Sequence, residues 1–162
     1  MKKKLIIMVL IILLIVACFI FFYNKERFNE TTNESVLERK DDNMNDFTSK
    51  INLNINGNDF TVTLEDNETS RELVNRLPLS ITMNELNGNE KYYYFDDALP
   101  SNSKRVGKIN KGDVMLYGDD CLVIFYESFT TSYSYTKIGT IDNSDNLEDV
   151  VGNNSVTVMI TR

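Results

Sequence analysis

The stretch that decides the fold runs from Ile51 to Glu65 and reads INLNINGNDFTVTLE. Apolar and polar residues alternate in INLNIN and again in FTVTLE. Alternation with a period of two is typical of a β-strand with one buried face. The dipeptide Asn56-Gly57 stands between the two halves and is strongly associated with two-residue hairpin turns. The sequence therefore predicts that the domain begins with a β-hairpin.

Further segments with strand character continue to the C-terminus. They are LSITM at 79–83, KYYYF at 91–95, VMLY at 114–117, CLVIFY at 121–126, TKIGTI at 136–141 and SVTVMIT at 155–161. CLVIFY is apolar on both faces, which indicates a central strand, and 96–111 reads as a long polar loop. About eight strands joined by polar turns predict a mainly β fold, a closed or nearly closed barrel.

One α-helix is expected after the hairpin. TSRE at Thr69–Glu72 matches a capping box, and Leu73, Val74 and Leu77 then fall on one side. Pro78 ends the helix. A helix with a single apolar stripe is expected to lie against a sheet, so we predict that it caps the barrel. A short helical turn is also expected in NLEDVVG at 146–152.

The chain begins with a candidate membrane segment. Leu5 to Tyr23 is a run of 19 residues without charge, and Lys2, Lys3 and Lys4 precede it. As a helix this run would span about 28 Å, close to the thickness of a bilayer core. Because positive flanks stay cytoplasmic, we predict a single-pass anchor at 1–23 in the cell membrane with an extracytoplasmic C-terminal domain. A polar tether at 24–49 would then lead to the β-domain at 50–162.

A lipoprotein anchor is the alternative. IVAC, ending at Cys18, resembles a bacterial lipobox, after which a signal segment would be cleaved and Cys18 lipidated. The apolar run continues beyond Cys18 as FIFFY, whereas a lipidated cysteine is usually followed by polar residues. Length and flanking charge favour the uncleaved anchor, and both alternatives make the membrane a partner of the N-terminal segment.

Composition excludes several classes of function. The chain has 17 Lys and Arg against 24 Asp and Glu, a net charge of −7, so binding of nucleic acid is not expected. Because the chain contains no His, catalytic triads and His-based metal sites are not expected either. No phosphate-binding or dinucleotide-binding motif occurs, so we predict no catalytic set, metal or cofactor. Cys121 opens an apolar run and is interpreted as a buried, inert thiol.

Several short motifs in one order resemble the small bacterial cyclophilin-like domain family. They are Asp66-Asn67-x-Thr69, Leu77-Pro78-Leu79, Glu90-Lys91, Gly112-Asp113, LVIFYESF at 122–129 and Gly139-x-Ile141. The resemblance covers nearly all of 50–162 and implies a cyclophilin-like β-barrel with a capping helix. Family members often carry Pro-Trp-Gly where this chain has Gly118-Asp119-Asp120, and no Trp occurs here.

The aromatic residues suggest three functions. An aromatic groove on the barrel could bind a peptide or a small ligand, with Tyr94, Tyr126 and Phe129 as candidates, whereas Phe125 is expected in the core. A weak peptidyl-prolyl isomerase or folding helper is an alternative, and the isomerase needs a positioned arginine, for which Arg105 is the candidate. A module that only contacts a structural partner is a further alternative. The sequence indicates neither the ligand nor the oligomeric state.

Overall fold

The computed structural model describes residues 47–162. The predicted membrane segment at 1–23, Cys18 within it and nearly all of the predicted tether lie outside the described residues. Neither of the two helices formed by residues 47–162 is long and apolar enough to cross a membrane.

The predicted hairpin opens the described domain. Strand β1 spans Lys50–Ile55 and strand β2 spans Asn58–Leu64, and the two pair antiparallel. The turn between them needs two residues in the left-handed region, and Asn56 and Gly57 supply them with φ of 50° and 81°. The hairpin predicted from alternation and turn chemistry is therefore confirmed.

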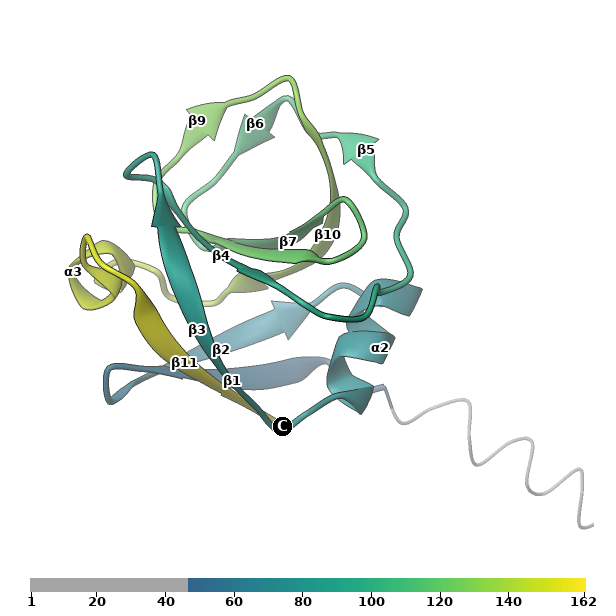
Figure 1. Ribbon diagram of the computed structural model, residues 1–162, viewed down its shortest axis with the longest axis horizontal. Coiled ribbons are helices and arrows are strands. Elements are labelled where there is room, and N and C mark those ends of the chain that lie inside the picture. Colours follow the sequence, from purple (N-terminus) through teal and green to yellow (C-terminus); the bar gives the residue numbers. More distant parts are fainter. Residues whose placement is uncertain (1–46) are drawn as a thin grey trace, which may run out of the picture. The chain divides into compact units, whose positions relative to one another are not determined.

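Eight antiparallel strands form a closed barrel. The order around it is β2-β1-β11-β3-β4-β8-β7-β10, and pairing of β10 with β2 closes the ring (Figure 1). The six remaining strands are β3 Leu79–Leu86, β4 Glu90–Tyr94, β7 Asp113–Tyr117, β8 Cys121–Phe125, β10 Ser134–Ile141 and β11 Val156–Thr161. The structure thus confirms the predicted barrel of eight strands.

Closure of the barrel depends on a close approach at Gly139. The register between β10 and β7 shifts between Lys137 and Gly139, and Gly139 pairs with Leu64 of β2. A Cβ atom at Gly139 would lie 2.5 Å from the carbonyl oxygen of Thr63 and 2.9 Å from Cγ1 of Val62. Only glycine fits this position without a shift of the β2 backbone.

Two helices cover the barrel interior. Helix α2 spans Glu68–Asn75 and helix α3 spans Leu147–Val151, on opposite sides of the barrel in Figure 1. Leu73 and Val74 of α2 belong to the buried cluster inside the barrel, and so do the first and last residues of α3. The apolar faces of both helices therefore close the interior formed by the strands.

The start of α2 differs from the prediction. Asn67 is the N-cap, and its Oδ1 accepts from the backbone N–H of Ser70 at 2.9 Å. Thr69, the predicted first residue of a capping box, lies inside the helix, and its hydroxyl donates to the carbonyl oxygen of Pro100 at 2.6 Å. The capping box was wrong because an earlier capping residue already satisfies the helix N-terminus.

Strand β8 is buried on both faces, as predicted for a central strand. Leu122 and Ile124 pack inside the barrel, whereas Cys121, Val123 and Phe125 belong to a second cluster on its outer face. Three short strands that were not predicted accompany the segments over this face. They are β5 Lys104–Arg105, β6 Lys108–Ile109 and β9 Phe129–Thr130, with β6 paired to β9 and β5 to β10.

Candidate ligand-binding site

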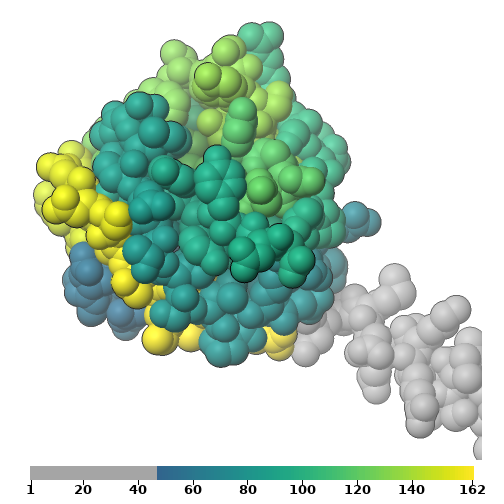
Figure 2. Space-filling model, in the orientation of Figure 1, coloured from purple at the N-terminus to yellow at the C-terminus, as the bar shows by residue number. Residues whose placement is uncertain are grey.

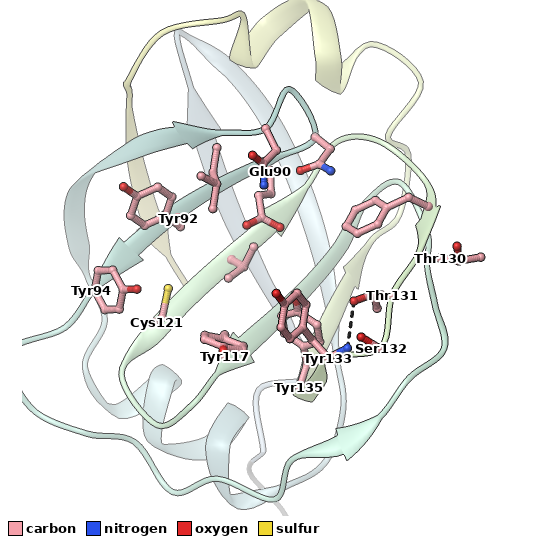
Figure 3. Close-up of a pocket in the computed structure, with 15 residues that line it drawn as sticks. Glu90, Tyr92, Tyr94, Tyr117, Cys121, Thr130, Thr131, Ser132, Tyr133 and Tyr135 are labelled. Carbon is pink, nitrogen blue, oxygen red and sulfur yellow. Dashed lines mark hydrogen bonds between the residues drawn. The ribbon is translucent and has the colours of Figure 1, made fainter.

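A pocket of about 530 Å³ lies on the outer face of the barrel, over β4, β7 and β8. The β3–β4 hairpin forms one wall, and residues 129–133 at and after β9 form the opposite wall (Figure 3). In Figure 1 the tip of this hairpin lies beside β9. The backbone N–H of Tyr126, just after β8, donates to the carbonyl oxygen of Asn89 at 3.0 Å and so ties the hairpin to the segment that leads to β9.

The alternation of KYYYF places two tyrosines of β4 in the pocket. Tyr92 and Tyr94 line it, with ring centroids 5.7 Å apart and ring planes at 75°. Tyr93 and Phe95 face the barrel interior, where their rings make an edge-to-face pair at 5.2 Å. Because successive side chains of a strand point to opposite faces, a single aromatic run supplies both the core and the pocket.

Three tyrosines face the β4 tyrosines across the pocket. The ring of Tyr117, at the end of β7, lies 6.0 Å from that of Tyr133 and 5.5 Å from that of Tyr135. Phe129 lines the same wall and packs on the buried ring of Phe125 at 5.7 Å. Phe125 is fully buried, which confirms its predicted place in the core.

Most of the large apolar side chains of residues 47–162 that are exposed to solvent line this pocket. Residues 47–162 include five large apolar side chains with high exposure, and four of them line this pocket: Leu86 at 42%, Tyr94 at 56%, Tyr117 at 43% and Tyr133 at 61%. The fifth is Met159 on β11. Figure 2 shows the two contributing regions side by side, residues near 90 in teal and residues near 130 in green. Exposed apolar clusters of this kind are typical of binding sites.

Cys121 and Val123 of β8 lie at the floor of the pocket. Burial raises the pKa of the Cys121 thiol to about 11. The thiol therefore stays protonated at neutral pH and is a poor nucleophile, which agrees with its interpretation as a buried, inert cysteine. The floor contributes shape and apolar surface.

The end of the pocket near the β3–β4 turn is polar. Glu90, which is labelled in Figure 3, and its neighbour Asn89 line the pocket. Burial raises the pKa of the Glu90 carboxyl, and the nearby negative charge of Glu85 raises it further. Oδ1 of Asn89 is buried and has no hydrogen-bond partner among the described residues. This end therefore presents the Glu90 carboxylate to the pocket, whose remaining lining combines aromatic rings with the hydroxyl side chains of residues 130–132.

The four predicted ligand-binding residues do not all converge. Tyr94 and Phe129 line the pocket together. Tyr126 is 2% exposed and packs inside the barrel, where its hydroxyl donates to Oε2 of Glu85 at 2.7 Å. Arg105 is exposed on β5, pairs with Ser134 of β10 and does not line the pocket. A role in ligand binding stays a prediction for all four, and the geometry favours Tyr94 and Phe129.

A buried ionic cluster supports the hairpin wall from inside the barrel. The ammonium group of Lys91 donates to Oε2 of Glu85 at 2.5 Å and to the carbonyl oxygens of Gly152 and Asn154 at 2.7 and 2.9 Å. Oε1 of Glu85 in turn accepts from the backbone N–H of Gly88 at 2.7 Å. The cluster thus ties the turn of the pocket hairpin to the segment between α3 and β11.

Sequence reasoning missed the polar end of the pocket and the cluster behind it. Glu90 and Lys91 were noted only as a shared motif, although alternation places Glu90 on the same face as Tyr92 and Tyr94. That periodicity was the available signal for Glu90. Nothing local in the sequence indicates that Lys91 reaches Gly152 and Asn154, because those contacts cross more than 60 positions.

A second pocket, of about 620 Å³, lies between α2, the loop at 100–106 and β10. Most of its lining residues are of polar type, among them Glu65, Lys104 and Lys137, and it shares Tyr135 with the aromatic pocket. Within 47–162 no three Asp, Glu or Cys side chains gather as a group that could hold a metal ion. The aromatic pocket is the better candidate for recognition of a ligand with apolar parts, because four of the five exposed large apolar side chains of residues 47–162 line it.

Comparisons with known proteins identify the family to which this barrel belongs. A family model described as the cyclophilin-like family matches residues 53–161. The solution structure of a hypothetical protein from Archaeoglobus fulgidus is similar with a TM-score of 0.50 and 20% sequence identity, over 74% of this chain and 99% of that one. At this identity the likeness shows the fold alone. A comparison with curated proteins gives no match. Because the family model spans more than half of the sequence, the chain belongs to the cyclophilin-like family.

Proposed function

We propose that the domain is a binding module that takes a peptide segment or a small ligand into the aromatic pocket. The observation that carries this proposal is the grouping of exposed apolar side chains: four of the five found in 47–162 line one pocket. Exposed aromatic surface of this kind is costly in water unless a partner covers it. A concave aromatic site with a few polar groups is the usual form of a small-ligand site.

Binding without chemistry fits the lining better than the isomerase alternative. The isomerase alternative relies on a positioned arginine beside the twisted amide. The lining of the aromatic pocket contains no Arg or Lys, and Arg105 lies elsewhere on β5. The thiol on the pocket floor is protonated and offers no nucleophile. A module that only contacts a structural partner would not require a concave site of about 530 Å³.

The proposal is tested with a neutral apolar dye whose fluorescence rises on binding, such as N-phenyl-1-naphthylamine. We expect saturable binding that competing apolar ligands displace. Tyr94→Ala and Tyr133→Ala should each weaken it about five- to tenfold, since a well-placed aromatic contact contributes about 1 kcal/mol. Both side chains are more than half exposed, so folding should be unaffected.

Met159→Ala is the matched control for these two variants. Met159 is 51% exposed and lies on β11 outside the pocket. Its replacement removes a similar amount of apolar surface and should leave the affinity for the dye unchanged. Equal losses in all three variants, or no loss at Tyr94 and Tyr133, would contradict binding in the aromatic pocket.

The proposed place of this module is the outer face of the cell membrane. Support comes from the sequence alone, namely the uncharged run from Leu5 to Tyr23 and the lysines before it. We expect mass spectrometry of the membrane-bound protein to recover residues 1–23 intact. Loss of residues 1–17 together with acyl chains on Cys18 would instead identify a lipoprotein.

A further inference from the structure

The geometry points to a ligand that carries a protonated amine, bound in the aromatic pocket with its ammonium group between the Glu90 carboxylate and the faces of the surrounding tyrosines. This inference deepens the proposed function and rests on it, because it specifies the chemical class that the same pocket selects.

The first argument is the missing partner of Glu90. Six ion pairs occur among residues 47–162, and Glu90 takes part in none of them. The neighbouring Lys91 points into the barrel and is committed to Glu85. Across the strands Glu90 pairs with Leu86 and Phe125, which carry no charge. A half-buried carboxylate without a partner costs free energy that a bound cation would recover.

The second argument is the shape of the aromatic lining. The rings of Tyr92 and Tyr94 meet at 75°, and those of Tyr117 and Tyr133 meet at 81°. In such an edge-to-face pair the ring that supplies its edge keeps its own faces free of its partner, so they are available for a further contact. An ammonium group within about 6 Å of such a face is attracted by the quadrupole of the ring. Figure 3 shows Glu90 and these tyrosines around the same space.

The third argument is the balance of donors and acceptors. The lining contains no Lys or Arg that would repel a cation or attract an anion. The carboxylate of Glu90 is the one charged group in the lining, and it only accepts hydrogen bonds. A primary ammonium has three N–H donors and no acceptor, so it matches this end better than a neutral or anionic group does.

The charge of the domain agrees with this choice. Residues 47–162 contain 10 Lys and Arg against 17 Asp and Glu. Glu85 adds negative charge close to Glu90. A cationic ligand would be drawn toward this surface, whereas an anionic ligand would be repelled. The lysine side chain of a peptide is one carrier of such a group, and a free alkylamine is another.

The test compares two probes of the same size, 2-phenylethylamine and 2-phenylethanol. Each probe is titrated into the full chain at neutral pH, and the NMR signals of residues 47–162 are followed. The amine is protonated at this pH and the alcohol is neutral. We expect the amine to bind about tenfold more tightly, since a charge-assisted contact with cation–π attraction is worth about 1.4 kcal/mol. Shifts should concentrate at Glu90 and the pocket tyrosines.

Glu90→Gln tests the carboxylate without changing the size of the side chain. We expect the tenfold preference for the amine to disappear, while the affinity for the alcohol stays the same and reports that the pocket is intact. Glu127→Gln is the matched control, because Glu127 lies close by in space, with its backbone N–H donating to the carbonyl oxygen of Asn89 at 3.3 Å, does not line the pocket and carries the same charge. It should retain the preference.

Three results would overturn the inference. Equal affinity for amine and alcohol in the unmodified protein would leave pocket binding in place and remove the selection for a cation. Retention of the preference in Glu90→Gln, or its equal loss in Glu127→Gln, would remove the role of the carboxylate. Binding of neither probe by a protein that still binds the neutral dye would also reject a cation site and leave the proposed function standing.

Discussion

Replacement of Gly139 by alanine is expected to lower the free energy of unfolding by about 3 kcal/mol, the upper part of the range for overpacking a rigid site. The added Cβ would meet the carbonyl oxygen of Thr63 at 2.5 Å, and backbone atoms cannot rotate away as a side chain can. The clash falls on the pairing of β10 with β2, which closes the barrel. Urea unfolding followed by circular dichroism measures the loss.

Gly107→Ala provides the comparison for this variant. Gly107 has a φ of 72°, and an added Cβ would meet nothing within 4 Å. The same chemical change there should cost only the penalty for a left-handed backbone, about 1 kcal/mol. Suppose that Gly139→Ala lowers the free energy of unfolding no more than Gly107→Ala does. The barrel would then tolerate separation of β2 from β10, and their close approach would not be needed for stability.

Replacement of Lys91 by alanine is expected to cost about 3 kcal/mol, in the range for removing one partner of a buried ion pair. The side chain of Lys91 is 1% exposed, and its removal leaves Glu85 and the carbonyl oxygens of Gly152 and Asn154 without their donor. We also expect NMR signals of the β3–β4 turn to shift, because Glu85 holds the N–H of Gly88. Urea unfolding at neutral pH measures the loss of stability.

At acidic pH, the difference in the free energy of unfolding between Lys91→Ala and the unmodified protein should become smaller. Burial acts to raise the pKa of the Glu85 carboxyl, but hydrogen bonds from Lys91, Tyr126 and Gly88 outweigh it and hold the pKa below the ordinary value of 4.5. A lowered pKa stabilises the folded state above pH 4.5, and this contribution is lost as the pH falls through the folded pKa. Unfolding at pH 7 and near pH 3 reports the change.

Two controls accompany the Lys91 experiment. Lys50→Ala removes an ion pair with Asp142 in which the side chains are 59% and 38% exposed, so stability should hardly change. Lys91→Met combined with Glu85→Gln should be less destabilising than the sum of the single variants, because no unpaired charge remains inside. A loss in Lys50→Ala as large as that in Lys91→Ala would contradict the importance of burial.

The barrel could be predicted from the sequence because its signals are local. Alternation along Ile51–Glu65 and a turn dipeptide determine a hairpin without reference to distant residues. The continuous apolar run of β8 predicted burial on both faces. It could not reveal which residue packs on which face, because every position is apolar. This ambiguity is why Tyr126 was grouped with the groove, although it shares the inner face with Leu122 and Ile124.

The pocket could be predicted only in part because it is assembled from distant segments. Alternation in KYYYF predicts that Tyr92 and Tyr94 share a face, and the structure confirms it. The opposite wall forms because residues 129–133 turn back over β8, which no local pattern in the sequence indicates. Arg105 was selected for its charge and its loop, and its position on β5 depends on pairing with Ser134, 29 residues later.

The closed ring of strands has a consequence for how a peptide could be recognised. Within residues 47–162 each of the eight barrel strands is hydrogen-bonded to a strand on both sides. A peptide therefore cannot extend the ring of eight strands by β-augmentation, in which main-chain hydrogen bonds supply much of the affinity, and within 47–162 unpaired strand edges occur only on the two-residue strands β5, β6 and β9. Recognition on the outer face is therefore expected to rely mainly on side-chain contacts. Discrimination among ligands should accordingly follow their side-chain chemistry more than their backbone conformation.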